Sequence, residues 1–98
     1  MAINYSRSRE EAESCAATAR ERGVKAVAIA CDVSDDAQVR AMIETCRAEF
    51  GRLDVLVNNA GTTHFVPHTD LEQMTEEKWD EILAVNLKGP FFVCRAAI

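Results

Sequence analysis

Residues 58–61 could contact a ligand, because two asparagines are followed there by an alanine and a glycine. They follow residues 53–57, an apolar run typical of a strand buried on both faces of a parallel sheet. Each asparagine carries two donors and an acceptor, which must bond backbone or a ligand at the end of such a strand. Open parallel sheets bind ligands at the carboxyl ends of their strands, where small residues allow a close approach. We therefore interpret Asn59, Ala60 and Gly61 as the floor of a ligand site, with an ordinary strand-to-loop turn as the alternative.

Asn86 is a second candidate, because it lies on the apolar face of a predicted helix that begins at Thr75. A buried amide in that position needs hydrogen-bond partners. Pro90, four residues later, has no N–H and cannot donate to the Asn86 carbonyl, and Gly89 eases the resulting bend. The spacing predicts a free main-chain carbonyl, for which a structural kink that meets water is one explanation.

Asp32 is a third candidate. It directly follows a predicted strand at residues 26–31 and precedes Ser34, the expected cap of the next helix. A carboxylate near a helix N-terminus can accept backbone N–H groups, which would be a local role. The same position at a strand end could instead contact a ligand, and the spacing alone leaves both roles open.

An alternation of strands and helices positions these residues. We expect strands at residues 2–3, 26–31 and 53–57, and helices over about residues 9–22, after Ser34 and from Thr75. Ser8 and Glu11 have the spacing of a capping box, and Gly23 and Gly51 are expected to end the first two helices. Such alternation implies parallel strands joined by crossovers, and therefore a doubly wound α/β sheet.

Composition excludes several classes of partner. The 98-residue chain is at most one domain, and its formal net charge of −5 without a Lys/Arg cluster argues against nucleic acid or an anionic membrane. No apolar stretch approaches the ~18 residues of a membrane-spanning helix. The cysteines have no metal-type spacing and lie in apolar patterns, so we expect no metal site and four reduced core residues of a cytoplasmic protein: Cys15, Cys31, Cys46 and Cys94.

The predicted loop at residues 62–74 contains both histidines. His64 and His68 flank Val66 and Pro67 and do not share a helical face, so we expect solvated side chains, with substrate contact as the alternative. The acidic residues around the start of the last helix are expected to be solvated as well: Glu72, Glu76, Glu77, Asp80 and Glu81.

The Asn-Asn-Ala-Gly string at residues 58–61 and the Asn86-Leu87-x-Gly89 spacing resemble motifs of the short-chain dehydrogenase/reductase family. The resemblance covers the whole chain, from the family's second strand to the helix after its fourth strand in a Rossmann-type domain. It implies that residues 58–61 steady the sheet beside a nicotinamide cofactor, and that Asp32 and the Val33 backbone hold the adenine ring. It also implies that Asn86 belongs to the catalytic tetrad, with its carbonyl holding a water that links the catalytic lysine to solvent.

The resemblance further implies that parts of the family's domain lie outside these residues. The family's first strand with its glycine-rich turn, its C-terminal strands, and its catalytic Ser and Tyr-x-x-x-Lys pair have no counterpart here. Because that first strand lies between the second and fourth strands of the family, we expect a gap at the centre of the visible sheet. Residues 1–98 are therefore interpreted as an internal fragment of one NAD(P)-binding domain.

The turn at residues 4–9 bears on the choice between NAD and NADP. In dinucleotide-binding folds an acidic residue after the strand bonds the ribose 2′-hydroxyl of NAD, whereas a nearby arginine accommodates the 2′-phosphate of NADP. This turn has no acidic residue and offers hydroxyls, including Ser6, and guanidiniums, of which Arg7 is the better candidate. The sequence favours NADP over NAD, with a solvated basic turn as the alternative.

The resemblance implies an NAD(P)-dependent oxidoreductase that transfers hydride between a nicotinamide and a small-molecule carbonyl or alcohol. The sequence is similar to the branch of 3-oxoacyl carrier-protein reductases and sugar dehydrogenases, and the family implies a homo-oligomer, either a dimer or a tetramer. The 98-residue chain alone is expected to be inactive, because three tetrad members are absent from it. The alternative is a catalytically inactive module that binds a nucleotide or associates with other subunits.

Overall fold

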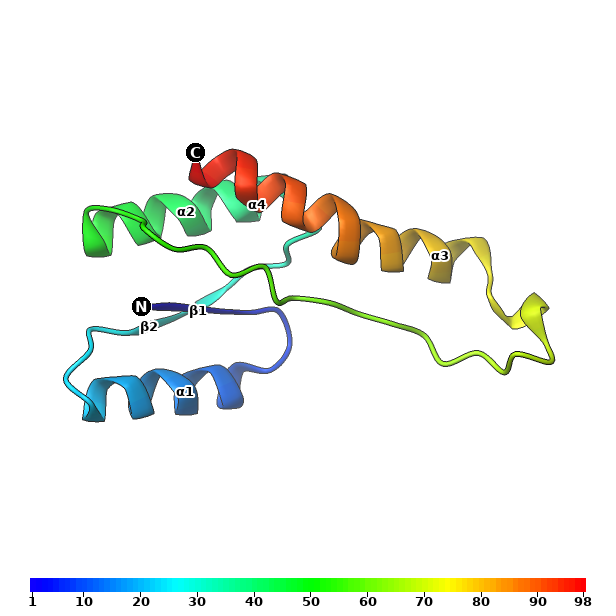
Figure 1. Ribbon diagram of the computed structural model, residues 1–98, viewed down its shortest axis with the longest axis horizontal. Helices are drawn as coiled ribbons and strands as arrows, with labels where there is room; N and C mark the ends of the chain where they lie inside the picture. The colour runs from blue at the N-terminus through cyan, green and yellow to red at the C-terminus, as the bar shows by residue number, and fades with distance from the viewer.

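Two short parallel strands lie at the centre of the structure, a computed structural model that describes all 98 residues. Helix α1 covers one face of the strand pair, and α2 and α4 lie together on the other face (Figure 1). The α/β class with parallel strands is therefore confirmed. The elements in chain order are β1 (Ala2–Tyr5), α1 (Arg9–Glu21), β2 (Val27–Ala30), α2 (Asp36–Phe50), η1 (Leu71–Gln73), α3 (Glu76–Leu83), η2 (Ala84–Lys88) and α4 (Gly89–Ala97).

Glycines end the first two helices, as the sequence predicts. Gly23 follows α1 with φ +80° and Gly51 ends α2 with φ +78°, a left-handed conformation that glycine adopts without steric cost. The predicted capping box at the start of α1 was wrong, because the Ser8 side chain makes no capping hydrogen bond.

Asp35, and not Ser34, caps α2. Its carboxylate accepts hydrogen bonds from the N–H groups of Ala37 at 2.9 Å and Gln38 at 3.2 Å. The Ser34 hydroxyl instead donates to Asp32 Oδ1 at 2.7 Å, and this bond keeps it away from the helix start.

The larger hydrophobic core lies between α2, α4 and the end of β2, and its buried members are Cys31, Val33, Val39, Met42, Ile43, Cys46 and Val93. A smaller cluster packs α1 against the sheet and consists of Ala16, Ala19 and Ala26. Cys15 and Cys94 are exposed, so the prediction of four core cysteines was wrong for these two. Cys15 borders an open cleft. Cys94 contacts Asn58, which lies in an extended segment outside the sheet.

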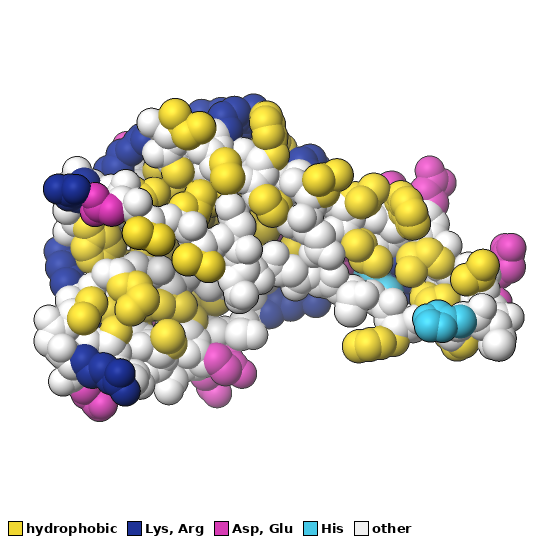
Figure 2. Space-filling model, viewed as in Figure 1, with side chains coloured by type: hydrophobic (Ala, Val, Ile, Leu, Met, Phe, Trp, Pro, Cys, Tyr) yellow, Lys and Arg dark blue, Asp and Glu magenta, His cyan; other side chains and the backbone are white.

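Residues 53–57 do not form the predicted strand. They run as an extended segment after α2 (Figure 1). Val55 and Val57 in this segment are 76% and 77% exposed. An apolar groove of about 790 Å³ lies between this segment and β1, with α2 side chains also lining it. A strand needs a neighbour to bond its N–H and C=O groups, and across this groove none is within reach. Figure 2 shows apolar side chains gathered over this face of the molecule.

Helix α3, the π-helical turn η2 and α4 follow one another as a continuous helical body (Figure 1). Thr75 caps its start by accepting a hydrogen bond from the Lys78 N–H at 3.4 Å, which confirms the predicted beginning of this helix. The predicted bend takes the form of the π turn, in which the Gly89 N–H donates to the Ala84 carbonyl. No helix of the structure has both the length and the apolar character needed to cross a membrane.

Gly89 has a packing role that the sequence did not predict. A Cβ atom at this position would lie 2.8 Å from Val33 Cγ2 and 3.3 Å from the Val33 carbonyl oxygen. The start of α4 therefore approaches the end of β2 more closely than any residue with a side chain would allow.

Candidate functional site

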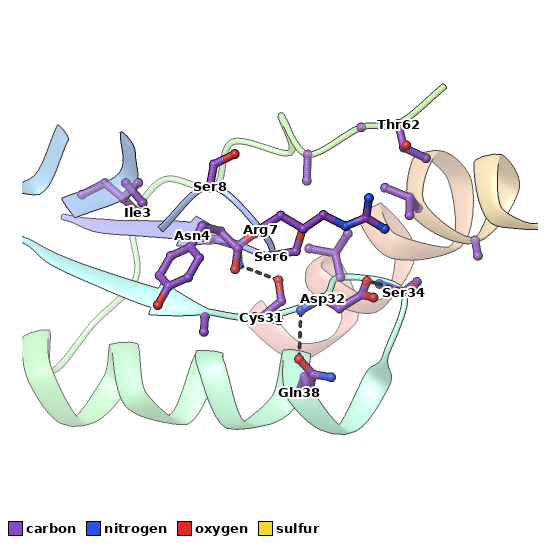
Figure 3. Close-up of a pocket in the computed structure, with 18 of the residues that line it drawn as sticks. Ile3, Asn4, Ser6, Arg7, Ser8, Cys31, Asp32, Ser34, Gln38 and Thr62 are labelled. Atoms are coloured by element: carbon purple, nitrogen blue, oxygen red, sulfur yellow. Dashed lines mark hydrogen bonds between the residues drawn. The ribbon is translucent and has the colours of Figure 1, made fainter. Parts of the chain in front are cut away.

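A cleft of about 930 Å³ opens at the carboxyl ends of β1 and β2. Three segments that are far apart in the sequence meet around it: the turns after the two strands and residues 60–62 (Figure 3). Side chains at the junction of α3 and η2 form the fourth wall. Six of the residues predicted to contact the cofactor line this cleft, namely Ser6, Arg7, Asp32, Val33, Ala60 and Gly61.

Asn4 joins the two strand ends. Its Nδ2 donates to the carbonyl oxygen of Cys31 at 2.9 Å (Figure 3). It also lies 3.4 Å from the carbonyl oxygen of Ile29 in β2. The two turns are thereby held side by side. Arg7 then extends from the end of β1 into the cleft, with its side chain 89% exposed.

Asp32 performs the local role that its position allows. Its Oδ1 accepts hydrogen bonds from the Ser34 N–H at 2.9 Å and the Ser34 hydroxyl at 2.7 Å. Its own N–H donates to Gln38 Oε1 at 3.0 Å (Figure 3). These bonds fix the turn and leave the Oδ2 atom of an exposed carboxylate free to accept a donor from a ligand.

Cys31, beneath this turn, is not a nucleophile. Burial, with the nearby carboxylates of Asp32 and Asp35, raises the pKa of its thiol from 9.0 to about 11. The thiol is therefore neutral at pH 7, whereas nucleophilic cysteines react as thiolates.

Asn86 is bonded twice to the backbone of Thr62. Its Oδ1 accepts from the Thr62 N–H at 2.8 Å, and its Nδ2 donates to the Thr62 carbonyl at 2.8 Å. The residue is exposed, so the prediction of a buried amide was wrong, but the amide does satisfy its bonding capacity on neighbouring backbone. Gly61 lies directly beside it, since a Cβ there would be 3.5 Å from Asn86 Oδ1. Asn86 thus fastens the residue after Gly61 to η2, at the edge of the cleft.

The two asparagines before Ala60 lie away from the cleft. Asn58 Nδ2 donates to Cys94 Sγ at 3.3 Å, and Asn59 lines the apolar groove beside β1. Asn59 therefore shares the groove with Val33 and Ala60 and does not line the cleft with the other candidate residues.

His64 and Glu81 form a contact that sequence reasoning missed. His64 Nε2 lies 2.7 Å from Glu81 Oε2. The prediction that both side chains are simply solvated was therefore wrong. Glu81 Oε1 lies 3.9 Å from Arg7 Nη2 on its other side. His68 remains exposed in the loop. The only sequence signal was the presence of a histidine and a carboxylate, which gives no indication of pairing across 17 residues.

The cleft is acidic overall. Arg7 is the one cationic side chain that lines it, and four carboxylates line it as well: Glu11, Asp32, Asp80 and Glu81. These carboxylates do not gather into a possible metal site, because no three His, Cys, Asp or Glu side chains come together in the structure.

Comparison with known proteins gives consistent matches along the whole chain. The profile of the family described as short chain dehydrogenase matches residues 1–98. The 3-oxoacyl-acyl-carrier-protein reductase FabG of Staphylococcus aureus is 43% identical over 91 residues, which are 93% of this chain and 36% of that protein. The chain thus spans little more than a third of the length of this relative.

Two solved structures are similar over 98% of the chain. A short-chain dehydrogenase/reductase from Burkholderia xenovorans superposes with a TM-score of 0.92 at 31% identity, and 40% of that chain is covered. The gluconate 5-dehydrogenase of Burkholderia cenocepacia J2315, in complex with NADP and tartrate, gives a TM-score of 0.79 at 38% identity, with 36% of its chain covered.

Proposed function

The chain belongs to the short-chain dehydrogenase family, and on this premise we propose that the whole protein is an NAD(P)-dependent oxidoreductase. It transfers hydride between a nicotinamide cofactor and a small-molecule carbonyl or alcohol, and the cofactor supplies the hydride chemistry. The observation that carries the proposal is the meeting of the two strand-end turns and residues 60–62 around one cleft. This is where open parallel sheets bind nucleotides.

The adenosine half of the cofactor fits the residues of this cleft. Asp32 keeps one carboxylate oxygen free for the adenine amino group, and the Val33 backbone lies next to it. Ser6 and Arg7 offer a hydroxyl and a guanidinium to the ribose and its 2′ substituent. Ala60 and Gly61 present little more than backbone, and Asn59 acts from the neighbouring groove.

Asn86 has a positioning and relay role in this proposal. Its side chain holds Thr62 beside the cleft, and its main-chain carbonyl, which Pro90 cannot bond, holds a water for proton transfer. The Ser, Tyr and Lys that would complete the tetrad belong to parts of the protein beyond these residues.

We assign NADP as the preferred cofactor, because the turn after β1 contains Arg7 and no acidic residue. The NADP bound to the related gluconate 5-dehydrogenase is consistent with this choice. The substrate class is that of the relatives, a 3-oxoacyl thioester or a sugar-type alcohol. A cytoplasmic location suits the free cysteines, and a homo-oligomer suits the family.

A second candidate is a catalytically inactive module that binds a nucleotide or associates with other subunits. The apolar groove beside β1 favours it, because an open strand edge promotes association. Dehydrogenase activity of the purified 98-residue chain would contradict this reading.

Two measurements test the proposed function. In a ¹⁵N NMR titration of the whole protein with NADP, we expect the shifts within residues 1–98 to fall on the amides of Arg7, Asp32, Val33 and Gly61. The absence of shifts in the folded protein, or shifts only at residues remote from the cleft, would contradict cofactor binding there. In the gene, a reading frame that continues into a glycine-rich turn upstream and a Tyr-x-x-x-Lys pair downstream would support the enzyme, and their absence would exclude it.

A further inference from the structure

We infer that Glu81 is a specificity-determining residue that weakens the preference of the cleft for a 2′-phosphate. It does so by holding a negative charge against Arg7, the group that would bind this phosphate. The inference rests on the proposed function, because it concerns the same cofactor cleft.

Glu81 makes contacts in two directions across the wall of the cleft. Its Oε1 lies 3.9 Å from Arg7 Nη2, and its Oε2 lies 2.7 Å from His64 Nε2. The His64 side chain is 30% exposed and the Glu81 side chain 42%, against 89% for Arg7. The carboxylate is therefore held on its histidine side, and a ligand that binds the exposed Arg7 guanidinium would have to separate it from Glu81.

The charges around Arg7 make its contact with Glu81 relevant to the choice between a 2′-phosphate and a 2′-hydroxyl. Among the side chains that line the cleft, Arg7 is the only cation, and of the four carboxylates there only Glu81 is paired with it. A phosphate that binds Arg7 must compete with Glu81 and also comes close to its charge. A ribose 2′-hydroxyl carries no charge and meets neither obstacle. Glu81 should thus disfavour the phosphorylated ligand while leaving the unphosphorylated one unaffected.

The size of the effect follows from the exposure of the pair. Ion pairs between solvent-exposed side chains are weak and are screened by salt. Removal of the Glu81 charge should therefore tighten binding of a 2′-phosphate by about two- to fivefold, and added salt should reduce the gain.

The experiment compares two probes, adenosine 2′,5′-bisphosphate and adenosine 5′-monophosphate, titrated into the whole protein by NMR. Glu81→Gln keeps an oxygen that can accept from His64, so the loop contact survives while the charge is lost. Glu76→Gln is the matched control, since it makes the same change on α3, forms no ion pair and does not line the cleft. We expect Glu81→Gln alone to raise the ratio of the two affinities. An equal ratio in both variants would overturn the inference.

A double variant tests whether the effect passes through Arg7. In an Arg7→Gln background, the gain from Glu81→Gln should shrink to less than half, and a gain of full size would overturn the competition with Arg7. The outcomes also separate the two proposals. If the whole wild-type protein binds both probes in the cleft and only the Glu81 effect is missing, the proposed function stands and this inference fails. If the whole wild-type protein binds neither probe, both fail.

Discussion

At the scale of single residues, the proposed function gives Asn86 two tasks, one for its side chain and one for its main-chain carbonyl. The amide bonds both polar groups of Thr62 at 2.8 Å, so one side chain fixes the edge of the cleft to η2. The carbonyl lacks its usual partner because Pro90, four residues later, has no N–H. The Asn86 side chain fixes the local backbone, so replacing it should also displace the Asn86 carbonyl.

In the whole protein, Asn86→Ala should lower kcat by ~10²-fold or more and change the cofactor Kd little, because the proposed cofactor contacts lie on other segments. Asn86→Asp keeps the acceptor for the Thr62 N–H and should lose less. The measurement is kcat as a function of pH together with a cofactor titration. Full turnover in Asn86→Ala, or a loss of cofactor affinity as large as the loss of turnover, would show that the residue only supports a structural kink.

The sequence predicts some of these contacts and not others. The need of the Asn86 amide for hydrogen-bond partners could be foreseen from its place on the apolar face of the predicted helix. The contact between His64 and Glu81 could not, because it depends on how residues 62–75 fold back onto α3. His64 lies in a loop and Glu81 on the surface of α3, and their spacing in the sequence does not predict a contact.

At the scale of elements, the contact between Gly89 and Val33 fixes how α4 meets the sheet. A Cβ at Gly89 would lie 2.8 Å from Val33 Cγ2, on a β-branched side chain with little freedom to move. We expect Gly89→Ala to destabilise the fold by about 1–2 kcal/mol, since the cost of overpacking exceeds the gain in helix propensity. Urea unfolding is the measurement. Combined with Val33→Ala the loss should be partly recovered, and strictly additive effects would mean that the contact is not the cause.

The start of α2 gives the fold a dependence on acid. The N–H and side-chain amide of Gln38 hold the pKa of Asp35 below its ordinary value of 3.8. Hydrogen bonds from Arg40 and then Arg95 lower the pKa of Asp36 in the same way. Because the folded-state pKa is lowered, the stabilisation is fully present above the unfolded value and is lost as the pH falls through the folded one.

Replacing Asp35 by Asn should therefore flatten the acid limb of stability. Asn keeps an oxygen that can cap α2, so stability near pH 7 should change little, while the loss below about pH 4 becomes smaller. The measurement is the thermal midpoint by circular dichroism between pH 3 and 7. The same substitution at Asp70, outside α2, is the control. A variant that follows the wild-type acid limb would contradict this role of the cap.

Helices could be predicted better than strands for a physical reason. Gly23 and Gly51 end helices through their own backbone conformations, and the apolar stripe of α2 is local in sequence. A strand at residues 53–57 needs a partner that the local sequence does not contain. The predicted strand was wrong for this reason: without a neighbour in reach, the apolar run remains an unpaired extended segment.

At the scale of the whole molecule, the structure is less compact than a complete domain. Its radius of gyration is 15.6 Å, whereas a compact domain of this length has about 13 Å. Only 12 of its 98 residues are buried. Part of the missing packing lies at the groove between β1 and residues 53–57, where the outer edge of β1 and an apolar segment both face open space.

Such a groove should make the isolated chain associate. Unpaired strand edges recruit other strands, and Val55 and Val57 would be covered in the process. In sedimentation velocity we expect the wild-type chain to form concentration-dependent oligomers or aggregates. Val57→Lys should reduce this association, because a lysine in the groove would have to be desolvated. Val24→Lys is the matched control, since Val24 is 44% exposed but does not line the groove. A wild-type chain that sediments as a monomer and unfolds cooperatively at the same concentrations would mean that the groove is closed in solution, and that the strand predicted at residues 53–57 finds a partner within the chain after all.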